Sequence, residues 1–254
     1  MTGVSGRPLS GAPKATRLRL SFYLRQLDQT SAQGLATISS ARLAAALGST
    51  AAQVRKDLSR FGQFGRPGVG YGVEDLRRTI RQLLGVDRRW PVAVVGIGNL
   101  GRALTRYRGF RERSFDVVAL FDTDPAVLGT TVAGITVSPL AEATAIMAKR
   151  GVRLAILTVP AEAALGAADA LIRAGVAGIL NFAPTTVRVP AGVALYPADL
   201  TVFLEQLSCQ VSGGAAASPH GERGGAASLD SRTEDQKGRS HRAPGRRISV
   251  DRRR

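Results

Sequence analysis

Three glycines with a spacing typical of phosphate binding occur near the middle of the chain. They follow the apolar run 92–95 and precede residues with helical spacing, in the segment Gly96-Ile97-Gly98-Asn99-Leu100-Gly101. We expect Gly96 to allow a tight turn, Gly98 to let a pyrophosphate approach the backbone at a helix start, and Gly101 to permit close helix–strand packing. In this strand-turn-helix setting the motif predicts a dinucleotide-binding site.

An acidic residue occurs at the end of the predicted strand that follows the glycine motif, where a dinucleotide site requires one. Asp122 ends the next predicted strand, 21 residues after Gly101, and a carboxylate there can accept hydrogen bonds from a ribose diol. The same charge would repel a 2′-phosphate, so the sequence favours NAD(H) over NADP(H). The alternative is that Asp122 is a solvated turn residue that caps the segment after it.

A second group of chemically useful side chains is basic and lies in the first quarter of the chain. The segment 51–61 has helical spacing, with apolar residues along one side. Its other side offers hydrogen-bond donors and positive charge: Arg55, Lys56, Ser59 and Arg60. Such a face can enter a DNA major groove and contact base edges and phosphates. The alternative is an ordinary solvated helix face.

The elements around this segment predict a winged helix. Apolar spacing and caps indicate helices over residues 16–29, 39–48, 51–61 and 74–84. A short Gly-containing turn joins the second and third of them, which makes a helix-turn-helix. Residues 62–72 alternate apolar side chains around a glycine-rich tip, and they predict a hairpin, or wing, that carries Arg66.

From residue 92 onward the pattern changes to alternating strands and helices. Predicted strands span residues 92–95, 117–121, 154–159, 178–181 and 193–196. The fold class is therefore α/β, with an N-terminal winged-helix domain, a Rossmann-type doubly wound parallel sheet and a disordered basic tail. The predicted segments are an arm (1–15), the winged-helix domain (16–85), a linker (86–91), the Rossmann domain (92–198), a dimerisation helix (199–211) and the tail (212–254).

Charge and composition restrict the partners. The net charge is +16, and Lys and Arg outnumber Asp and Glu by 15 to 5 in residues 1–90 but only by 10 to 9 in residues 91–211. A basic winged helix beside a neutral domain favours double-stranded DNA as partner. Cys209 is the only cysteine, and His220 and His241 both lie in the tail, so no disulfide or metal site is expected within the fold. Without an apolar run long enough for a bilayer or a signal-peptide pattern, we expect no membrane association and a cytoplasmic location.

The helix and wing segments resemble those of the Rex family of redox-sensing transcriptional repressors. The similarity covers Gln53-Val54-Arg55-Lys56-Asp57-Leu58-Ser59 and continues through Phe61-Gly62 and Gly68-Val69-Gly70-Tyr71. In that family the helix enters the major groove and the wing reaches toward the minor groove. The resemblance implies DNA contacts from Arg55, Lys56 and Ser59 on the helix and from Arg66 on the wing.

The resemblance spans about residues 17–211 and includes segments similar to those that line the dinucleotide in Rex proteins. Besides the glycine motif and Asp122, it implies that NADH or NAD⁺ is contacted by Thr158, Val159, Pro160, Asn181, Phe182, Ala183 and Pro184. Tyr107 and Asp199 correspond to sensing residues of the family. The chain departs from the family pattern at Arg108, where proline is expected, and at Leu200, where some members carry phenylalanine against the partner's nicotinamide pocket.

These features predict a sensor of the NADH/NAD⁺ ratio rather than an enzyme. The resemblance implies a homodimer that leaves a palindromic operator when NADH binds, with each C-terminal helix packed into its partner. A dehydrogenase would need a proton donor or acceptor beside the hydride, and the predicted Rossmann domain has no histidine and a single lysine, Lys149. Two alternatives remain: an NAD-dependent oxidoreductase with a basic accessory domain, and a repressor that responds to another nucleotide ligand such as CoA.

Overall fold

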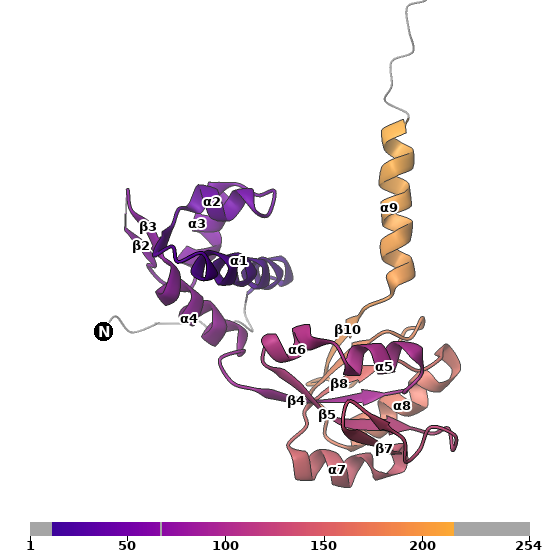
Figure 1. Ribbon diagram of the computed structural model, residues 1–254. Helices are drawn as coiled ribbons and strands as arrows, with labels where there is room; N and C mark the ends of the chain where they lie inside the picture. Colours follow the sequence, from indigo (N-terminus) through magenta and orange to yellow (C-terminus); the bar gives the residue numbers. More distant parts are fainter. Residues whose placement is uncertain (1–11, 67, 216–254) are drawn as a thin grey trace, which may run out of the picture. The chain divides into compact units, whose positions relative to one another are not determined.

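The computed structural model describes residues 12–66 and 68–215 of the chain (Figure 1). Most of the predicted arm and of the predicted tail lies outside these ranges. The end of the predicted arm is helical from Lys14, where the first helix begins, and the start of the predicted tail is helical up to Ala215. Apolar periodicity did not reveal these terminal turns, since they carry few large apolar side chains.

The N-terminal domain is a winged helix. Its elements are α1 (Lys14–Ala32), β1 (Thr37–Ile38), α2 (Ser40–Ala45), α3 (Ala51–Ser59), β2 (Gly65–Arg66), β3 (Gly70–Gly72) and α4 (Val73–Leu84). β3 lies between β1 and β2 in an antiparallel sheet. The α2–α3 pair is the predicted helix-turn-helix, and the β2–β3 hairpin is the predicted wing.

Side-chain caps begin both helices of the helix-turn-helix. The Ser39 hydroxyl accepts a hydrogen bond from the backbone N–H of Arg42 at 3.1 Å, and the Thr50 hydroxyl accepts one from the N–H of Gln53 at 3.1 Å. Each bond satisfies an N–H group that has no partner inside its helix. Both helices end slightly earlier than predicted, at Ala45 and at Ser59.

The sequence does not predict strand β1, which depends on a tertiary contact. Gly70 has a φ of +94°, and a Cβ atom at this position would lie 2.6 Å from the carbonyl oxygen of Ile38. Glycine therefore lets β3 approach β1 closely. A strand of two residues is too short to show an alternating apolar pattern, so only the folded wing reveals it.

One apolar core holds the winged helix together. On α1, the apolar side chains Leu20, Leu24 and Leu27 recur at helical spacing and are buried. α1 packs along α4. Val54 and Leu58 place the inner side of α3 in the same core. Their burial fixes which side of α3 remains available to a partner.

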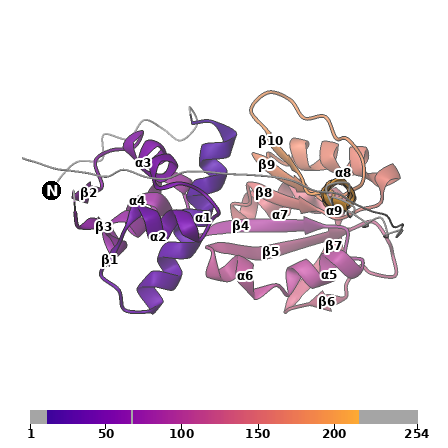
Figure 2. The same ribbon diagram turned by 90° about the horizontal axis from the view of Figure 1, so that it is seen from above.

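The second domain is a Rossmann-type sheet covered by helices on both faces. Its elements are β4 (Trp90–Val95), α5 (Asn99–Thr105), α6 (Arg108–Glu112), β5 (Phe115–Asp122), β6 (Thr131–Val132), β7 (Ile135–Pro139), α7 (Ala143–Arg150), β8 (Leu154–Leu157), α8 (Ala161–Arg173), β9 (Gly178–Asn181) and β10 (Ala194–Pro197). The strand order is β10-β9-β8-β4-β5-β7-β6. Every pairing is parallel except that of β6 with β7, and Figure 2 shows β4 between β5 and β8.

Alternating residues of β4 divide the core into two layers. Val92 and Val94 pack in the cluster that includes residues of α5 and α6, whereas Ala93 and Val95 pack in the cluster that includes α7 and α8. Figure 1 shows α5 and α6 above the sheet and α7 below it. The domain is therefore the predicted doubly wound sheet, with its helices on opposite faces.

All five predicted strands are present, with differences at their ends. β4 already begins at Trp90, so the predicted linker 86–91 is shorter. β8 ends at Leu157, two residues before the predicted end of this strand. The sequence does not predict β6 and β7, which lie at one edge of the sheet. α9 (Leu200–Ala215) extends the predicted C-terminal helix.

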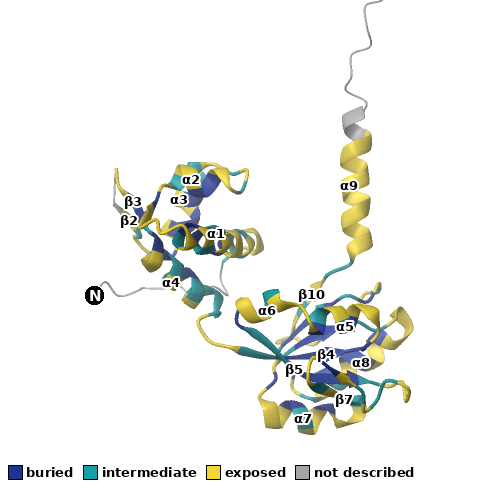
Figure 3. Ribbon diagram, in the orientation of Figure 1, coloured by how far each residue is buried: buried dark blue, intermediate teal, exposed yellow. Residues whose placement is uncertain are grey.

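Exposure sets α9 apart from the rest of the described chain (Figure 3). Its apolar side chains Leu200, Phe203, Leu204 and Leu207 are each more than half exposed. No helix in residues 12–66 or 68–215 has the length and apolar character to cross a membrane.

Candidate functional site

The glycine motif forms a tight turn between β4 and α5. Gly96 has a φ of +90°, and a Cβ there would lie 2.8 Å from both the carbonyl oxygen of Thr158 and a methyl carbon of Val159. A side chain at position 96 would therefore be strained and would also clash with the neighbouring strand end. Gly96 has the turn-forming role that the sequence predicts.

The other two glycines differ in their surroundings. A Cβ on Gly101 would overlap the carbonyl oxygen of Gly96, whereas a Cβ on Gly98 would meet nothing within 4 Å. Gly101 thus allows α5 to pack against the turn, and Gly98 faces open space at the start of α5. Asn99 and Leu100 are exposed beside it, while Ile97 is buried in the core.

Asp122 joins the glycine turn to the end of β5. One of its carboxylate oxygens accepts a hydrogen bond from the backbone N–H of Ile97 at 2.6 Å. The other accepts from the N–H groups of Thr123 at 2.7 Å and Asp124 at 3.0 Å. The residue therefore caps the segment after it, as the alternative interpretation held, and it also holds the turn. A carboxylate has about four acceptor positions, so one remains for a ligand.

The end of β8 is bonded to the same turn. The Thr158 hydroxyl lies 2.9 Å from the carbonyl oxygen of Val95 and 2.7 Å from that of Gly96. Val159 and Pro160 follow at the start of α8, and Pro160 is exposed. Thr158 therefore orients the turn through its side chain.

The segment after β9 is organised by Asn181. This buried side chain donates to the carbonyl oxygens of Ala183 and Thr185 at 3.3 and 3.1 Å and accepts from the N–H of Ala183 at 3.0 Å. Ala183 is buried, Phe182 is half-buried, and Pro184 is exposed. The Asn181 amide is occupied by its own loop, so its contribution to a ligand site is to shape the 182–184 segment.

These segments meet at one edge of the sheet. The turn follows β4, Asp122 ends β5, and residues 158–160 and 182–184 follow β8 and β9. The strand order β9-β8-β4-β5 places them side by side at the carboxyl ends of parallel strands, which is where α/β sheets bind ligands. The structure thus brings the predicted cofactor residues together.

The outer side of α3 is the second candidate site. The side chains predicted to contact DNA are exposed there: Arg55, Lys56, Ser59 and Arg60. The Arg55 guanidinium donates to the Ser40 hydroxyl at 3.1 Å, and the Ser59 hydroxyl donates to the carbonyl oxygen of Lys56 at 3.1 Å. Arg66 belongs to β2 of the wing, and its side chain lies outside the described part of the structure.

Asp57, on the inner side of α3, is a buried structural residue that the sequence analysis does not single out. Its side chain is 1% exposed and accepts hydrogen bonds from Arg19 at 2.6 and 2.8 Å, from Tyr23 at 3.0 Å and from Gln53 at 3.0 Å. Burial alone would raise the pKa of Asp57, but these hydrogen bonds outweigh it and lower the pKa below its ordinary value. The sequence does contain a signal for this residue, because Asp57 is a charged side chain on the apolar side of a predicted helix.

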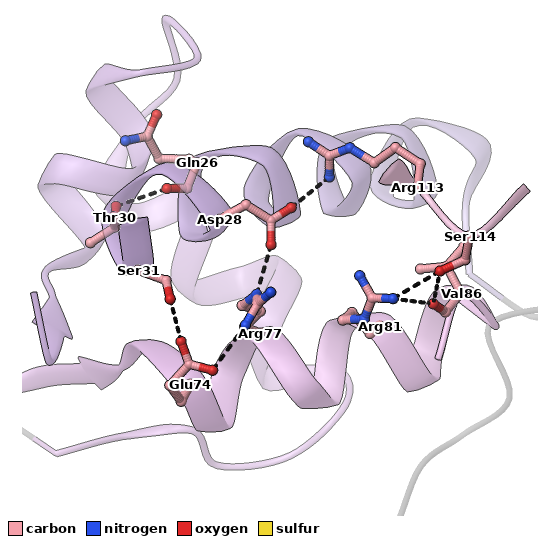
Figure 4. A network of polar contacts seen from close by, with 10 residues as sticks. All are labelled: Gln26, Asp28, Thr30, Ser31, Glu74, Arg77, Arg81, Val86, Arg113 and Ser114. Carbon is pink, nitrogen blue, oxygen red and sulfur yellow. Dashed lines mark hydrogen bonds and ion pairs between the residues drawn. The ribbon is translucent and has the colours of Figure 1, made fainter. Parts of the chain in front are cut away.

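A polar network connects α1 to α4 and to the segment after α6 (Figure 4). The Asp28 carboxylate accepts from Arg77 of α4 at 2.7 Å and from Arg113 at 2.7 Å. Arg81 donates to the Ser114 hydroxyl at 2.9 Å. The winged helix is therefore bonded directly to the residues that precede β5.

The predicted sensing residues lie at two separate places in the chain. Tyr107, between α5 and α6, is 59% exposed and packs edge-on against Phe110, with ring centres 5.1 Å apart. Asp199 accepts a hydrogen bond from the N–H of Thr201 at 2.9 Å at the start of α9, and Leu200 beside it is exposed. No hydrogen bond joins Tyr107 to Asp199 in the part of the chain described.

A cavity of about 880 Å³ lies beside α6 and the sheet. Its wall includes Arg25 and Asp28 of α1 and Tyr107, and its floor includes Ile156 of β8 and Leu180 of β9. α5 and α6 contact β4 and β5 on this face, which leaves the other half of the sheet as the cavity floor. The floor is an apolar surface that a helix could cover.

Both domains of the chain match family models. The family model described as "CoA binding domain" matches residues 87–185, and the one described as "Putative DNA-binding protein N-terminus" matches residues 12–59. A redox-sensing transcriptional repressor Rex of Desulfitobacterium hafniense is 48% identical over 199 residues, which cover 78% of this chain and 95% of the relative.

Two solved structures of RSP, a Rex-family repressor, are also similar. The complex with β-NAD⁺ and operator DNA has a TM-score of 0.77 at 32% identity and covers 81% of this chain and 94% of its own. The complex with β-NADH has a TM-score of 0.73 at 30% identity, covering 81% and 97%.

A winged helix and a glycine-turn Rossmann domain in one chain define the class of ligand-responsive DNA-binding regulators. Within that class, the identity over nearly the whole length of its relative places this chain in a single family. The chain belongs to the Rex family of redox-sensing transcriptional repressors.

Proposed function

We propose that this Rex-family protein binds NADH and NAD⁺ at the glycine turn and uses that binding to control its hold on operator DNA. The observation that carries the proposal is Asp122, which touches the turn at Ile97 and keeps an acceptor position for a ribose hydroxyl. A dinucleotide across the carboxyl ends of the strands would extend from Asp122 over Gly98 toward residues 158–160 and 182–184. The β-NAD⁺ and β-NADH complexes of RSP support this ligand.

The outer side of α3 is the proposed DNA-reading surface. Lys56 and Ser59 are exposed near its centre, and the buried side fixes its direction through Val54 and Leu58. The charged side chains would contact phosphates and base edges in the major groove, and Arg66 would contact DNA from the wing. The operator complex of RSP supports this assignment.

A homodimer would cover two apolar surfaces that are exposed in the single chain. α9 exposes Leu200, Phe203, Leu204 and Leu207 at helical spacing, and the 880 Å³ cavity has an apolar floor on β8 and β9. We assign the α9 of a second copy to this cavity. A two-fold dimer of this kind requires a palindromic operator, because two identical α3 surfaces then read two half-sites.

The protein acts in this proposal as a sensor without turnover. Catalysis would require a proton-transferring side chain beside the nicotinamide, and the residues assembled at the sheet edge are mostly glycine, proline and apolar residues together with Asp122, whose three backbone bonds hold the turn. Incubation of NADH with the protein and candidate carbonyl substrates should leave the absorbance of NADH unchanged.

The deciding experiment measures DNA affinity against each ligand in turn. A palindromic duplex selected from a random pool by this protein would be titrated at fixed salt, with fluorescence anisotropy as the readout. NADH should weaken binding at least tenfold and NAD⁺ should restore it, because an effector acts only through unequal affinity for two states. DNA binding that NADH leaves unchanged would exclude the sensor mechanism.

CoA is the second candidate ligand, since a family model for CoA binding matches residues 87–185. The same titration with CoA separates the two. Release of the duplex by CoA and not by NADH would favour the alternative, whereas we expect CoA to have no effect at concentrations where NADH acts.

Replacing Asp122 by alanine should weaken NADH binding at least tenfold. The variant removes the ribose acceptor and also the 2.6 Å bond that holds Ile97 in the turn, so both the contact and the shape of the site are lost. Quenching of protein fluorescence, or the fluorescence of NADH itself, gives the affinity. Operator binding without ligand should stay within twofold of the unmodified protein.

Lys56→Ala should have the reverse effect of Asp122→Ala. It removes one exposed cation from α3 and should weaken operator binding about tenfold, in line with about 1–3 kcal/mol for a good base contact, while NADH affinity stays unchanged. A different result would be that Asp122→Ala and Lys56→Ala each weaken the binding of NADH and of operator DNA to the same extent. That result would contradict the assignment of α3 to DNA binding and of the glycine turn to NADH binding.

A further inference from the structure

A second cavity, of about 620 Å³, lies on the other side of α6. It is lined by the end of α5, by α6, by the first residues of β5 and by Ile135 at the start of β7. These are the amino-terminal ends of the strands. The glycine turn and Asp122 lie at the opposite, carboxyl ends, so the two sites are separate.

Arginines dominate the charge of this cavity. Its lining includes Arg106, Arg108 and Arg111, all exposed, against the carboxylates of Glu112 and Asp116. Asp116 is already paired with Arg89 at 3.1 Å, and Arg111 lies 3.9 Å from it. Within the described ranges, Arg106 and Arg108 have no carboxylate within ion-pair distance. Two guanidinium groups are therefore available to an anion.

The floor of the same cavity is apolar and partly aromatic. Phe110, Phe115 and Val117 line it and are half-buried. A flat ring can lie on such a floor, while guanidinium groups at the rim bind phosphate through paired N–H donors. The volume is within the range of small-molecule sites. A nucleotide has both a flat ring and phosphate groups, so it fits a cavity with an aromatic floor and arginines at its rim.

We propose that this arginine cavity binds a phosphorylated nucleotide as a second effector, separate from the glycine turn. α6 connects this cavity to the winged helix. Its aromatic residue Phe110 contacts Tyr107, and Arg113, one residue past α6, bonds Asp28 of the winged helix at 2.7 Å. A ligand held by Arg106 and Arg108 would restrain the start of α6 and hence this contact. The effect on DNA rests on the proposed function, whereas binding itself does not.

The test uses the full chain with ATP as the probe, measured by isothermal titration calorimetry with NADH at saturation. ATP should bind, and Arg106→Ser/Arg108→Ser should weaken it at least tenfold. Lys149→Ser/Arg173→Ser removes two exposed cations from the opposite face of the sheet and should leave ATP affinity unchanged. Inorganic pyrophosphate should displace ATP, because the rim recognises phosphate.

Several results would overturn the proposal. They are no ATP binding, equal loss in both double variants, failure of pyrophosphate to compete, or loss of ATP binding in Asp122→Ala, which would locate ATP at the glycine turn. NADH fluorescence is followed in the same samples. Loss of the NADH signal with ATP binding retained at the arginines would count against the proposed function alone.

Discussion

Replacing Asp57 by alanine should lower the free energy of unfolding of the winged helix by about 3 kcal/mol, because it breaks a buried ion pair by removing one partner. Asp57 is 1% exposed, and its loss leaves the Arg19 guanidinium, the Tyr23 hydroxyl and the Gln53 amide without their common acceptor. Arg19 is 29% exposed, so water recovers part of the cost. Operator affinity should fall with stability, since Asp57 holds α3 in place.

Urea denaturation followed by circular dichroism gives the change in stability. The control is Asp75→Ala, because Asp75 is 86% exposed and pairs with Arg78 at 3.5 Å. An exposed pair of this kind contributes at most about 0.5 kcal/mol. NADH binding should persist in both variants, which would show that the Rossmann domain is intact. Equal stability of the two variants would contradict the role given to Asp57.

The same residue should make the winged helix sensitive to acid. The pKa of Asp57 is lower in the folded chain than its ordinary value, so the unfolded chain binds a proton more readily. Its stabilisation is fully present above about pH 4, the ordinary pKa of an aspartate, and is lost as the pH falls through the folded-state value. Asp57→Asn should remove this part of the pH dependence.

Replacing Phe203 and Leu207 of α9 by serine should convert the proposed dimer to monomers and weaken operator binding at least about a hundredfold. The first effect follows because these side chains, 59% and 56% exposed in the single chain, would lose their apolar burial in the cavity of the second copy. The second follows because two linked reading surfaces bind a palindrome far more tightly than one.

Analytical ultracentrifugation measures the assembly, and anisotropy measures DNA affinity. Glu205→Ser/Gln206→Ser, on the opposite side of α9, is the control and should leave both unchanged. NADH binding in the Phe203/Leu207 variant tests whether the sheet remains folded. A variant that is still dimeric, or a wild-type protein that is monomeric at the concentrations used for DNA binding, would exclude α9 as the dimer contact.

The departures at Arg108 and Leu200 have different structural settings. Arg108 opens α6 and lines the arginine cavity, so a substitution there changes the charge beside Tyr107. Leu200 opens α9 and is 59% exposed, where an apolar side chain of another shape can still pack against a partner. Both positions can therefore change the strength of the response while leaving the fold unaltered.

Features that depend on residues close together in the chain could be predicted from the sequence. The caps at Ser39 and Thr50 join residues three apart, the burial of Val54 and Leu58 follows from helical period, and the turn at Gly96 needs a positive φ. Parallel strands with intervening helices fix the edge at which the cofactor residues meet. Local backbone chemistry is sufficient for all of these.

Features that depend on residues far apart required the tertiary structure. Asp57 meets Arg19 from 38 positions away, and Asp28 meets Arg113 from 85 positions away. Neither pairing has a periodic signal, because each depends on how whole elements pack. The same holds for strand β1 and for the two cavities beside α6. The sequence by itself determined the two kinds of site, and only packing decided how they are connected.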